Sequence, residues 1–443
     1  MNPAITVRGR FVSGMLTLGF SMLLQPVTGQ EIITLPEALS TGIANNFSIV
    51  LQRNDAAVAA NNNTLGNAGF WPALTLNGAN NNSFQTTHQE TASGSTKDVV
   101  NAPSMTFNAG IALSWTLFDG FNMFVSKKML GTLEDLGQTG TRIVMEQTIQ
   151  DIMLTYYGII QQKKMVLVRK QAVDLSLQRK RIAEAKLSLG AGSNLMLLQS
   201  TVDLNADSTA LIQQITALNN SRTDFNRLLA REPATRFDIQ DSISLRDTLI
   251  LDTLLKQALA QNTVLIDARY RLQYAGLEVR QMQADRYPAV NLTGGYNYNE
   301  LHSQTGYLTF NQSHGFSIGV NLSMNLFDGM NVNRRIRNAR ILLNSSETEL
   351  QDAELRLKAD LIKIYDQYLT NLEIIRMQLS NVRVAGENVD VAFEKYKLGS
   401  INDIELREIQ KKLIEAQYEL LLSQFEAKKA EVELIRISGN LLN

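Results

Sequence analysis

The chain has 443 residues, no cysteine and a formal net charge of −1. The lack of cysteine excludes disulfides, thiol catalysis, cysteine metal sites and a lipidated N-terminal cysteine. The near-neutral charge provides no basic field for a nucleic-acid partner. The three histidines, His88, His302 and His314, lie in polar loop stretches, where surface residues are expected rather than metal ligands.

The N-terminus is typical of a signal peptide. Arg8 and Arg10 precede an apolar run at residues 11–24, and the small residues at 27–29 form a cleavage site before Gln30. The apolar run is too short to cross a bilayer as a helix, and no later stretch reaches about 18 uninterrupted apolar residues. Residues 1–29 are therefore predicted to be removed, and any membrane crossing by the mature chain is predicted to use strands.

The rest of the chain is an internal duplication. The motif Leu-Phe-Asp-Gly occurs at 117–120 and again at 326–329, each time after a strand-like stretch and before a long helical run. Both runs cover 70 residues, from Gly120 to Gly190 (190 − 120) and from Gly329 to Gly399 (399 − 329). Earlier in each copy, Asn46 matches Asn262 and Pro72 matches Pro288 at one common offset. Motifs and helix-breaking residues that recur at a fixed spacing indicate an internal repeat.

Each copy is predicted to contain a helix, a pair of strands, a long helix and a return helix. The expected units are repeat one at 30–230 (strand pair 73–118, long helix 120–188, return helix 193–230), a linker or equatorial segment at 231–250, and repeat two at 251–443 (strand pair 289–327, long helix 329–397, return helix 402–437).

The predicted strands alternate with a period of two. From Phe316 to Leu326 every second residue is apolar, and the residues between are small or polar; 107–117 and 290–298 repeat the pattern. Strands of about 10 residues with one apolar and one polar face are typical of transmembrane barrels. Taken alone, the pattern fits a soluble sandwich with one buried face equally well.

Counting strands favours a shared barrel. Four strands cannot enclose a water-filled interior, because even the smallest barrels need about eight. An open sheet edge in hydrocarbon would leave backbone groups without hydrogen bonds. If the strands cross a membrane, several chains must therefore form one barrel. Trp115, Tyr296 and Tyr298 are then expected at the membrane interface, where amphipathic aromatic side chains gather.

The helices carry heptad stripes. Leu343, Leu350, Leu357 and Ile364 recur every seven residues, and the return helices repeat the pattern with Leu406 and Leu413 or Leu197 and Leu204. A run of 70 residues rises roughly 105 Å at about 1.5 Å per residue. The two short helices of each copy, placed end to end, match this length. The linker at 231–250 lacks the stripe and is expected where the short helices meet.

Together these features resemble the TolC-like outer-membrane efflux channels of Gram-negative bacteria. The matching marks are the signal peptide, the duplication, Leu-Phe-Asp-Gly after each second strand, and Lys-Tyr-Lys-Leu-Gly at 395–399 before an acidic helix start. The resemblance covers essentially the whole mature chain. It implies a mixed fold in which a trimeric, all-antiparallel, twelve-stranded β-barrel, with four strands per chain, continues as a long α-helical coiled-coil tunnel.

The resemblance also implies a cellular setting. The barrel would lie in the outer membrane and the helical part in the periplasm. The partners would be a homotrimer, a periplasmic adaptor (membrane fusion) protein and an inner-membrane pump of RND or ABC type. No nucleic acid and no cofactor are expected.

In the family, polar rings just past the tip turn close the periplasmic end. Counting from Gly399, the acidic gate positions of repeat two are Glu405 and Glu408. Three copies would place six carboxylates around the axis, and such rings favour cations in a narrow constriction. The same pair is also explained as solvated carboxylates near a helix N-terminus.

The chain departs from the family pattern at the tip. The gate positions of repeat one are Met196 and Gln199, and Ile401 replaces a basic residue often found after the second-repeat glycine. A tip tethered by ion pairs is therefore not the expectation, and a methionine ring would form an apolar constriction instead.

The turns and junctions complete the predicted sites. The tip turns that would contact the adaptor are Leu189, Gly190, Leu398 and Gly399, although glycine there is equally explained as a helix stop. The barrel-to-helix junctions are Asp119, Gly120, Asp328 and Gly329.

The predicted function is a passive export duct rather than an enzyme. The sequence has no zinc-site spacing, no glycine-rich phosphate loop and no nucleophile motif. The alternative is a trimeric coiled-coil stalk or adhesin anchored by a small barrel. Strands that are internal, duplicated and flanked by helices favour the duct. The substrate, whether drug, metal or protein, is not indicated.

Overall fold

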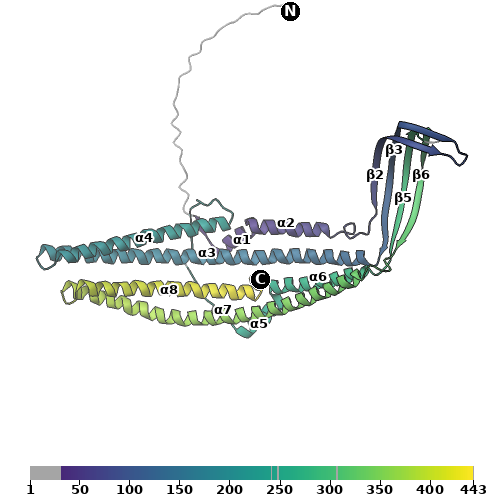
Figure 1. Ribbon diagram of the computed structural model, residues 1–443. Helices are drawn as coiled ribbons and strands as arrows, with labels where there is room; N and C mark the ends of the chain where they lie inside the picture. The colour runs from purple at the N-terminus through teal and green to yellow at the C-terminus, as the bar shows by residue number, and fades with distance from the viewer. Residues whose placement is uncertain (1–30, 241, 247–248, 306–307, 443) are drawn as a thin grey trace, which may run out of the picture.

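The computed structural model describes residues 31–240, 242–246, 249–305 and 308–442. The predicted signal peptide lies outside the described residues. The chain forms a long helical body, and a four-stranded sheet projects from one end of it (Figure 1).

The sheet consists of four antiparallel strands in the order β2-β3-β5-β6, which are β2 (Ala73–Glu90), β3 (Thr96–Asp119), β5 (Ala289–Ser303) and β6 (Phe310–Ser323). Copy one supplies β2 and β3, and copy two supplies β5 and β6. The copies join where β3 pairs with β5, so β2 and β6 are left as open edges.

The register of the sheet separates its two faces. Ile111 lies opposite both Leu76 and Tyr296, and Tyr296 lies opposite Phe316. Because directly opposed residues share a face, the apolar positions of all four strands gather on one side. That side includes Leu74, Leu76, Ile111, Leu113, Trp115, Leu292, Phe316, Ile318, Val320 and Leu322. The residues that alternate with these along the same part of the strands point to the other side of the sheet. They are Asn, Ser, Thr, Gly and Ala, with no charged side chain.

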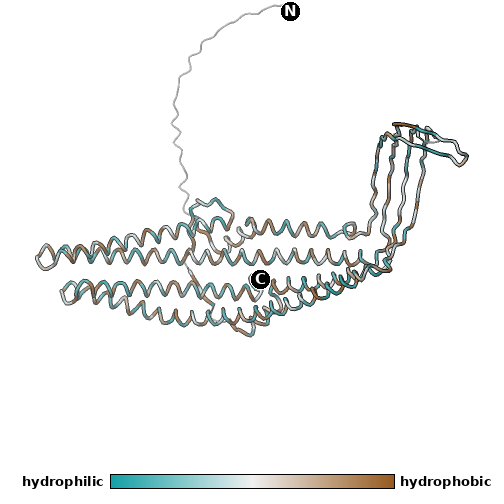
Figure 2. The backbone as a smooth tube through the Cα atoms, in the orientation of Figure 1, coloured by the Kyte–Doolittle hydropathy of each residue, from teal (hydrophilic) through white to brown (hydrophobic). Residues whose placement is uncertain are grey.

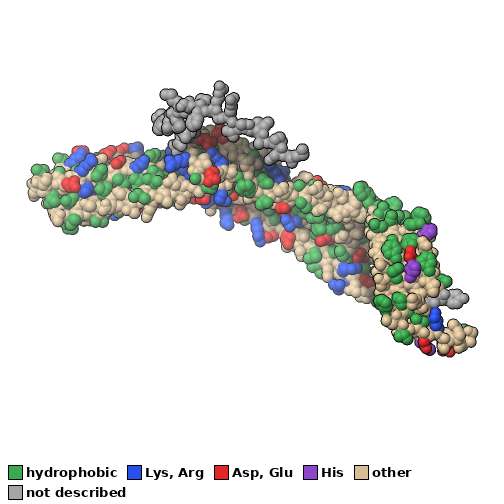
Figure 3. Space-filling view, turned by 90° about the horizontal axis from the view of Figure 1, so that it is seen from above, with side chains coloured by type: hydrophobic (Ala, Val, Ile, Leu, Met, Phe, Trp, Pro, Cys, Tyr) green, Lys and Arg blue, Asp and Glu red, His purple; other side chains and the backbone are tan. Residues whose placement is uncertain are grey.

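The apolar face of the sheet is bare. Phe316 and Ile318 are 90% and 84% exposed, and patches of hydrophobic side chains lie on the sheet end of the surface in Figure 3, between polar and small residues. A soluble sandwich would bury this face beneath a second sheet. Within the described residues, the one other sheet has two short strands and packs elsewhere.

Two long helices of equal length form the frame of the helical body. They are α3 (Asn122–Ser188) and α7 (Asn331–Lys397), each of 67 residues and therefore about 100 Å long. Each turns back into a return helix, α4 (Asn194–Leu228) or α8 (Asp403–Ile437). Hydrophobic and polar stretches alternate along all four helices (Figure 2).

An asparagine interrupts the first helix of each copy. Instead of one helix from Leu35 to about Gly69, the structure has α1 (Leu35–Asn45) and α2 (Phe47–Asn62), and copy two has α5 (Leu251–Gln261) and α6 (Thr263–Ala284). The breaks fall at Asn46 and Asn262.

The two asparagines join the short helices end to end. The Asn46 side chain donates to the Leu228 carbonyl at 2.8 Å, which closes the end of α4, and its oxygen accepts from the backbone of α2. Asn262 makes the same pair of contacts between Ile437 of α8 and the start of α6. A single side chain therefore satisfies free groups at two helix ends.

The linker packs where the short helices meet. It contains β4 (Phe237–Ile239), which pairs in parallel with β1 (Glu31–Ile33). Phe237 and Ile239 join a buried cluster with Ile33 and Phe225. No described helix has an apolar window long enough to span a bilayer.

The fourth strand is shorter than its sequence pattern. The alternation predicted a strand to 327, but β6 ends at Ser323. The matching part of β3 continues to Asp119 because β5 pairs with it there. Within one chain β6 has a partner on one side, and that partner begins at Ala289, opposite Ser323.

Candidate functional site: the helical tip

The tip turns have the same backbone design in both copies. Gly190 and Gly399 adopt left-handed conformations, with φ of +73° and +77°. The Ala191 amide donates to the Lys186 carbonyl at 2.9 Å, and the Ser400 amide donates to the Lys395 carbonyl at 2.9 Å. These bonds define a Schellman turn, which ends a helix and favours glycine.

Both turns present a leucine to solvent. Leu189 and Leu398 are each 81% exposed. The two turns form the end of the helical body that is farthest from the sheet (Figure 1).

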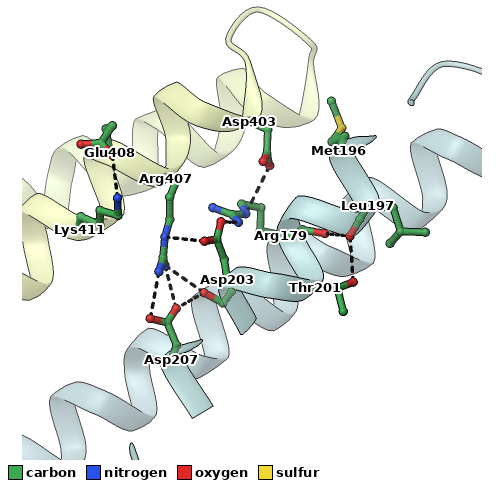
Figure 4. A network of polar contacts seen from close by, with 12 residues as sticks. Arg179, Met196, Leu197, Thr201, Asp203, Asp207, Asp403, Arg407, Glu408 and Lys411 are labelled. Atoms are coloured by element: carbon green, nitrogen blue, oxygen red, sulfur yellow. Dashed lines mark hydrogen bonds and ion pairs between the residues drawn. The ribbon is translucent and has the colours of Figure 1, made fainter. Parts of the chain in front are cut away.

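Five charged residues behind the turns form an ion-pair network, which we call the tip cluster: Arg179, Asp203, Asp207, Asp403 and Arg407. Arg407 binds Asp207 through two hydrogen bonds, of 2.8 and 3.0 Å. Arg179 pairs with Asp203, and its Nε lies 3.3 Å from Asp403. The side chains come from α3, α4 and α8 and converge between these helices (Figure 4).

The tip cluster is shielded from solvent. The Arg179 side chain is fully buried, and those of Asp207 and Arg407 are about one-tenth exposed. Burial disfavours the charged form of Arg407, but the hydrogen bonds and charge of Asp207, aided by Asp203, outweigh it and raise its pKa. Ser176 of α3 donates to Asp207 and accepts from Arg407, which brings a further polar group into the network.

Tyr396 links the tip cluster to α7. Its hydroxyl donates to Asp403 at 3.1 Å and lies 3.6 Å from the Met196 sulfur. Burial, and then the nearby charge of Asp403, raise the pKa of Tyr396, so it stays a neutral donor. Lys186 of α3 lies over the Tyr396 ring and donates to its carbonyl oxygen at 2.6 Å. Side-chain contacts therefore join all four tip helices.

The predicted gate residues separate into two groups. Glu405 and Glu408 are exposed near the start of α8, and Glu408 pairs with Lys411 at 3.0 Å on the surface. Gln199 is exposed on α4. Met196, in contrast, is half-buried against Tyr396 within the chain. Met196 is therefore packed against its own chain and does not project freely, as the predicted constriction by a ring of methionines would require.

The Leu-Phe-Asp-Gly motif builds each junction between sheet and helix. Asp119 accepts from the Met123 amide at 3.1 Å, and Asp328 accepts from the Val332 amide at 2.8 Å. A carboxylate at this position caps the helix start and complements its dipole. The next two residues of each copy are left-handed, with φ between +62° and +70°. This conformation favours glycine at Gly120 and Gly329.

The predicted interface aromatics are spread along the apolar face. The Trp115 indole donates to the Phe70 carbonyl at 2.9 Å, at the helical end of the sheet. Tyr298 donates to Glu300 farther along, and Tyr296 packs on Phe316 between them. Trp115 lies opposite Leu292, and the six residues from Leu292 to Tyr298 (298 − 292) span roughly 20 Å at about 3.4 Å per residue.

The tip cluster was missed from the sequence. Its charges lie on three helices and become neighbours only when the hairpins pack together. One signal was present: Asp203 and Asp207 are four residues apart and therefore share a face of α4.

A sheet with one bare apolar face and one polar face, carried on duplicated helical hairpins, defines a class: a membrane channel protein with a helical extension. The description "Outer membrane efflux protein" belongs to a family model that matches residues 254–440. The outer membrane efflux protein BepC of Brucella suis is 19% identical over 422 residues, which cover 94% of this chain and 88% of BepC.

Solved structures share the fold. The CmeC outer membrane channel of Campylobacter jejuni is 14% identical with a TM-score of 0.77, over 99% of this chain and 94% of CmeC. The outer membrane protein VceC of Vibrio cholerae is 13% identical with a TM-score of 0.76, over 91% and 96%. The chain resembles the outer membrane efflux proteins, as predicted, and its place is the outer membrane, with the helical part in the periplasm.

Proposed function

We propose that this protein is the outer-membrane export duct of a tripartite efflux or type I secretion system. It passively conducts substrates that a periplasmic adaptor and an inner-membrane pump of RND or ABC type deliver. The observation that carries this proposal is the sheet, whose apolar face suits lipid and whose polar face suits a water-filled lumen. The sheet continues into helices long enough to reach far into the periplasm. Such a duct needs no catalytic residue.

A trimer completes the barrel in this proposal. Edge β6 of one chain pairs with edge β2 of the next, and three chains give twelve strands without a free edge. The early end of β6 at Ser323 supports this pairing. Within one chain β6 has no second neighbouring strand, and a strand from the next chain would pair with the residues beyond Ser323.

The junction glycines also support the trimer. A methyl group at Gly120 would collide with the Ala284 carbonyl and lie 2.9 Å from Cβ of Tyr287. At Gly329 the nearest atom of the same chain is 3.6 Å away. The repeat counterpart of Ala284 is Ala68, at the offset that relates Pro288 to Pro72. Ala68 of a neighbouring chain is the expected contact for Gly329.

We assign the gate to the first turns of α8 and α4. Three copies of Glu405 and Glu408, with Gln199, line the narrowest part of the tunnel and favour cations. Met196 positions the start of α4, which carries Gln199, through its contact with Tyr396 of α7. We also assign the adaptor contact to the exposed side chains of Leu189 and Leu398 and to their turn glycines. Trp115, Tyr296 and Tyr298 face the lipid near the membrane interfaces.

Conductance in a planar bilayer tests this function against the stalk or adhesin. A duct gives discrete current steps, and their reversal potential in a salt gradient shows cation preference. Replacing both Glu405 and Glu408 with glutamine, which preserves size, should weaken that preference. Lys411→Met is the matched control, because it frees Glu408 from its surface pair and should strengthen the preference. Trimers that pass no current, with or without the glutamines, would support a stalk.

A further inference from the structure

Arginine is absent from the four-stranded sheet and returns where copy two joins the helices. The sequence has no arginine at 287–333, and Arg286 lies just before β5. The start of α7 then carries four arginines before its first acidic residue, Glu347; they are Arg334, Arg335, Arg337 and Arg340. A strongly basic segment therefore lies directly beside the sheet.

Copy one carries aromatic side chains where copy two carries arginine and asparagine. The copies are offset by 216 residues before the strands (288 − 72) and by 209 residues in the long helices (329 − 120). Phe70 and Phe124 thus correspond to Arg286 and Asn333. The rings of Phe70 and Phe124 pack with their centroids 5.0 Å apart, and Arg286 donates to the Asn333 side chain at 2.8 Å. The repeat keeps the contact and changes its chemistry.

The aromatic pair of copy one identifies the side of the junction on which these residues lie. The Phe70 carbonyl accepts its hydrogen bond from Trp115, a residue of the apolar face of the sheet. Because Arg286 occupies the repeat position of Phe70, Arg286 and Asn333 lie on the side of the apolar face.

Arg335 marks the opposite side of α7. It pairs with Asp285 at 2.9 Å, and both line a cavity of about 430 Å³ together with Ser323. Ser323 alternates with Leu322 along β6 and therefore belongs to the polar face of the sheet. Arg335 thus faces the polar side of the junction.

Arg337 and Arg340 point away from that side. At about 100° per residue, they lie roughly 200° and 140° around α7 from Arg335, and therefore on the side of Arg286. All three are exposed. Within the described part of the chain, no ion pair includes any of the three. Their positive charges are left for a partner outside the chain.

We propose that Arg286, Arg337 and Arg340 bind the phosphate of an anionic phospholipid in the leaflet of the outer membrane that faces the periplasm. The acyl chains of this lipid lie against the apolar face of the sheet, and its headgroup lies at the junction. Guanidinium groups match phosphate oxygens through paired hydrogen bonds. The inference depends on the sheet lying in the membrane and not on what the protein conducts.

The depth of the three arginines fits a lipid headgroup. Along α7, Arg337 lies about 6 Å and Arg340 about 10 Å farther from the sheet than Asn333. Helical side chains tilt toward the N-terminus, which here is the sheet end, and long arginine side chains extend farther in that direction. The headgroup layer on each side of a bilayer is roughly 5–8 Å thick. The guanidinium groups can therefore reach this layer, where basic residues attract anionic lipids.

Quenching of tryptophan fluorescence by brominated phospholipids measures lipid binding at this place. The chain has two tryptophans, Trp71 and Trp115. Trp71 follows Phe70 at the junction, and Trp115 lies opposite Leu292 of β5, the strand that Arg286 precedes. The purified protein is reconstituted in matched vesicles that contain either brominated phosphatidylglycerol or brominated phosphatidylcholine. The ratio of the two quenching titrations gives the preference for the anionic lipid.

The unmodified protein should prefer phosphatidylglycerol, and Arg337→Gln with Arg340→Gln should lower the preference by about fivefold for each arginine removed. Arg335→Gln is the matched control, because it removes the same charge from the same helix turns on the polar side. It should leave the preference unchanged. Equal quenching by the two lipids in the unmodified protein, or equal preference in the double variant and the control, overturns the proposal.

A soluble anion distinguishes a lipid site from a site for free phosphate. Glycerol phosphate, added at the concentration of the brominated phosphatidylglycerol, should leave the quenching unchanged because it has no acyl chains to lie on the apolar face. Loss of quenching would assign the arginines to a soluble phosphate and overturn the lipid. None of these measurements requires the protein to conduct, so they stand apart from the test of the duct.

Discussion

Replacing Arg407 with leucine, the residue at its repeat counterpart, removes the central cation of the tip cluster. The change leaves Asp207 about one-tenth exposed and paired with Ser176 alone. Removing one partner of a buried ion pair costs about 3–5 kcal/mol. Because Ser176 still donates to the orphaned carboxylate, the lower end of the range, about 3 kcal/mol, is expected for local opening of the tip. That is roughly a 150-fold change at about 1.4 kcal/mol per tenfold.

Hydrogen–deuterium exchange measures this opening directly. Amides in the first turns of α8 should lose protection by about two orders of magnitude, while those in β5 should not change. The double variant Arg407→Leu with Asp207→Ala should recover most of the protection, because removing both partners avoids an unpaired buried charge. The reasoning is refuted if the single variant exchanges like the unmodified protein, or if the double variant is as unprotected as the single.

Three further changes test other parts of the structure. Gly329→Ala should reduce trimer yield on native gels by more than its backbone strain of about 1–2 kcal/mol explains, and normal assembly would argue against a neighbouring chain at that junction. Asp328→Ala should lower the temperature of trimer dissociation, consistent with loss of about 1 kcal/mol of helix capping, whereas Asp328→Asn should retain most of it. Burial raises the pKa of Glu146 above its ordinary value of 4.5, against the hydrogen bond from Thr263, so the folded state loses stability as pH rises from 4.5 through the raised value. Glu146→Gln should therefore be more heat-stable than the unmodified protein at pH 8 and equal to it at pH 4; a less stable variant at pH 8 would contradict this assignment.

The features that the sequence predicted are local or repeated. The tip turns at Gly190 and Gly399 and the junctions at Asp119 and Asp328 each depend on a few neighbouring residues, so a motif indicated where they lie, although not the hydrogen bonds that form them. The alternation of the strands likewise predicted which residues share a face. The duplication reinforced each of these patterns by showing it twice.

The features that were missed depend on contacts between distant segments. Asn46 was read as part of a helix because its role requires the carbonyl of Leu228, far away in the sequence. Arg179 is fully buried, an unusual position for arginine, and it is there because Asp203 and Asp403 arrive from two other helices. The early end of β6 has the same origin, since a strand extends only where a partner is present.

The equal lengths of α3 and α7 have a consequence for how this architecture can change. Both helices begin at a capping aspartate and end at a Schellman glycine, and both have 67 residues. Equal lengths bring the two tip turns of the chain to the same level. Shortening only one of the helices by a heptad would set its turn back by roughly 10 Å, at about 1.5 Å per residue. A change of length that keeps the two turns level must therefore add or remove the same number of residues in both copies of the repeat.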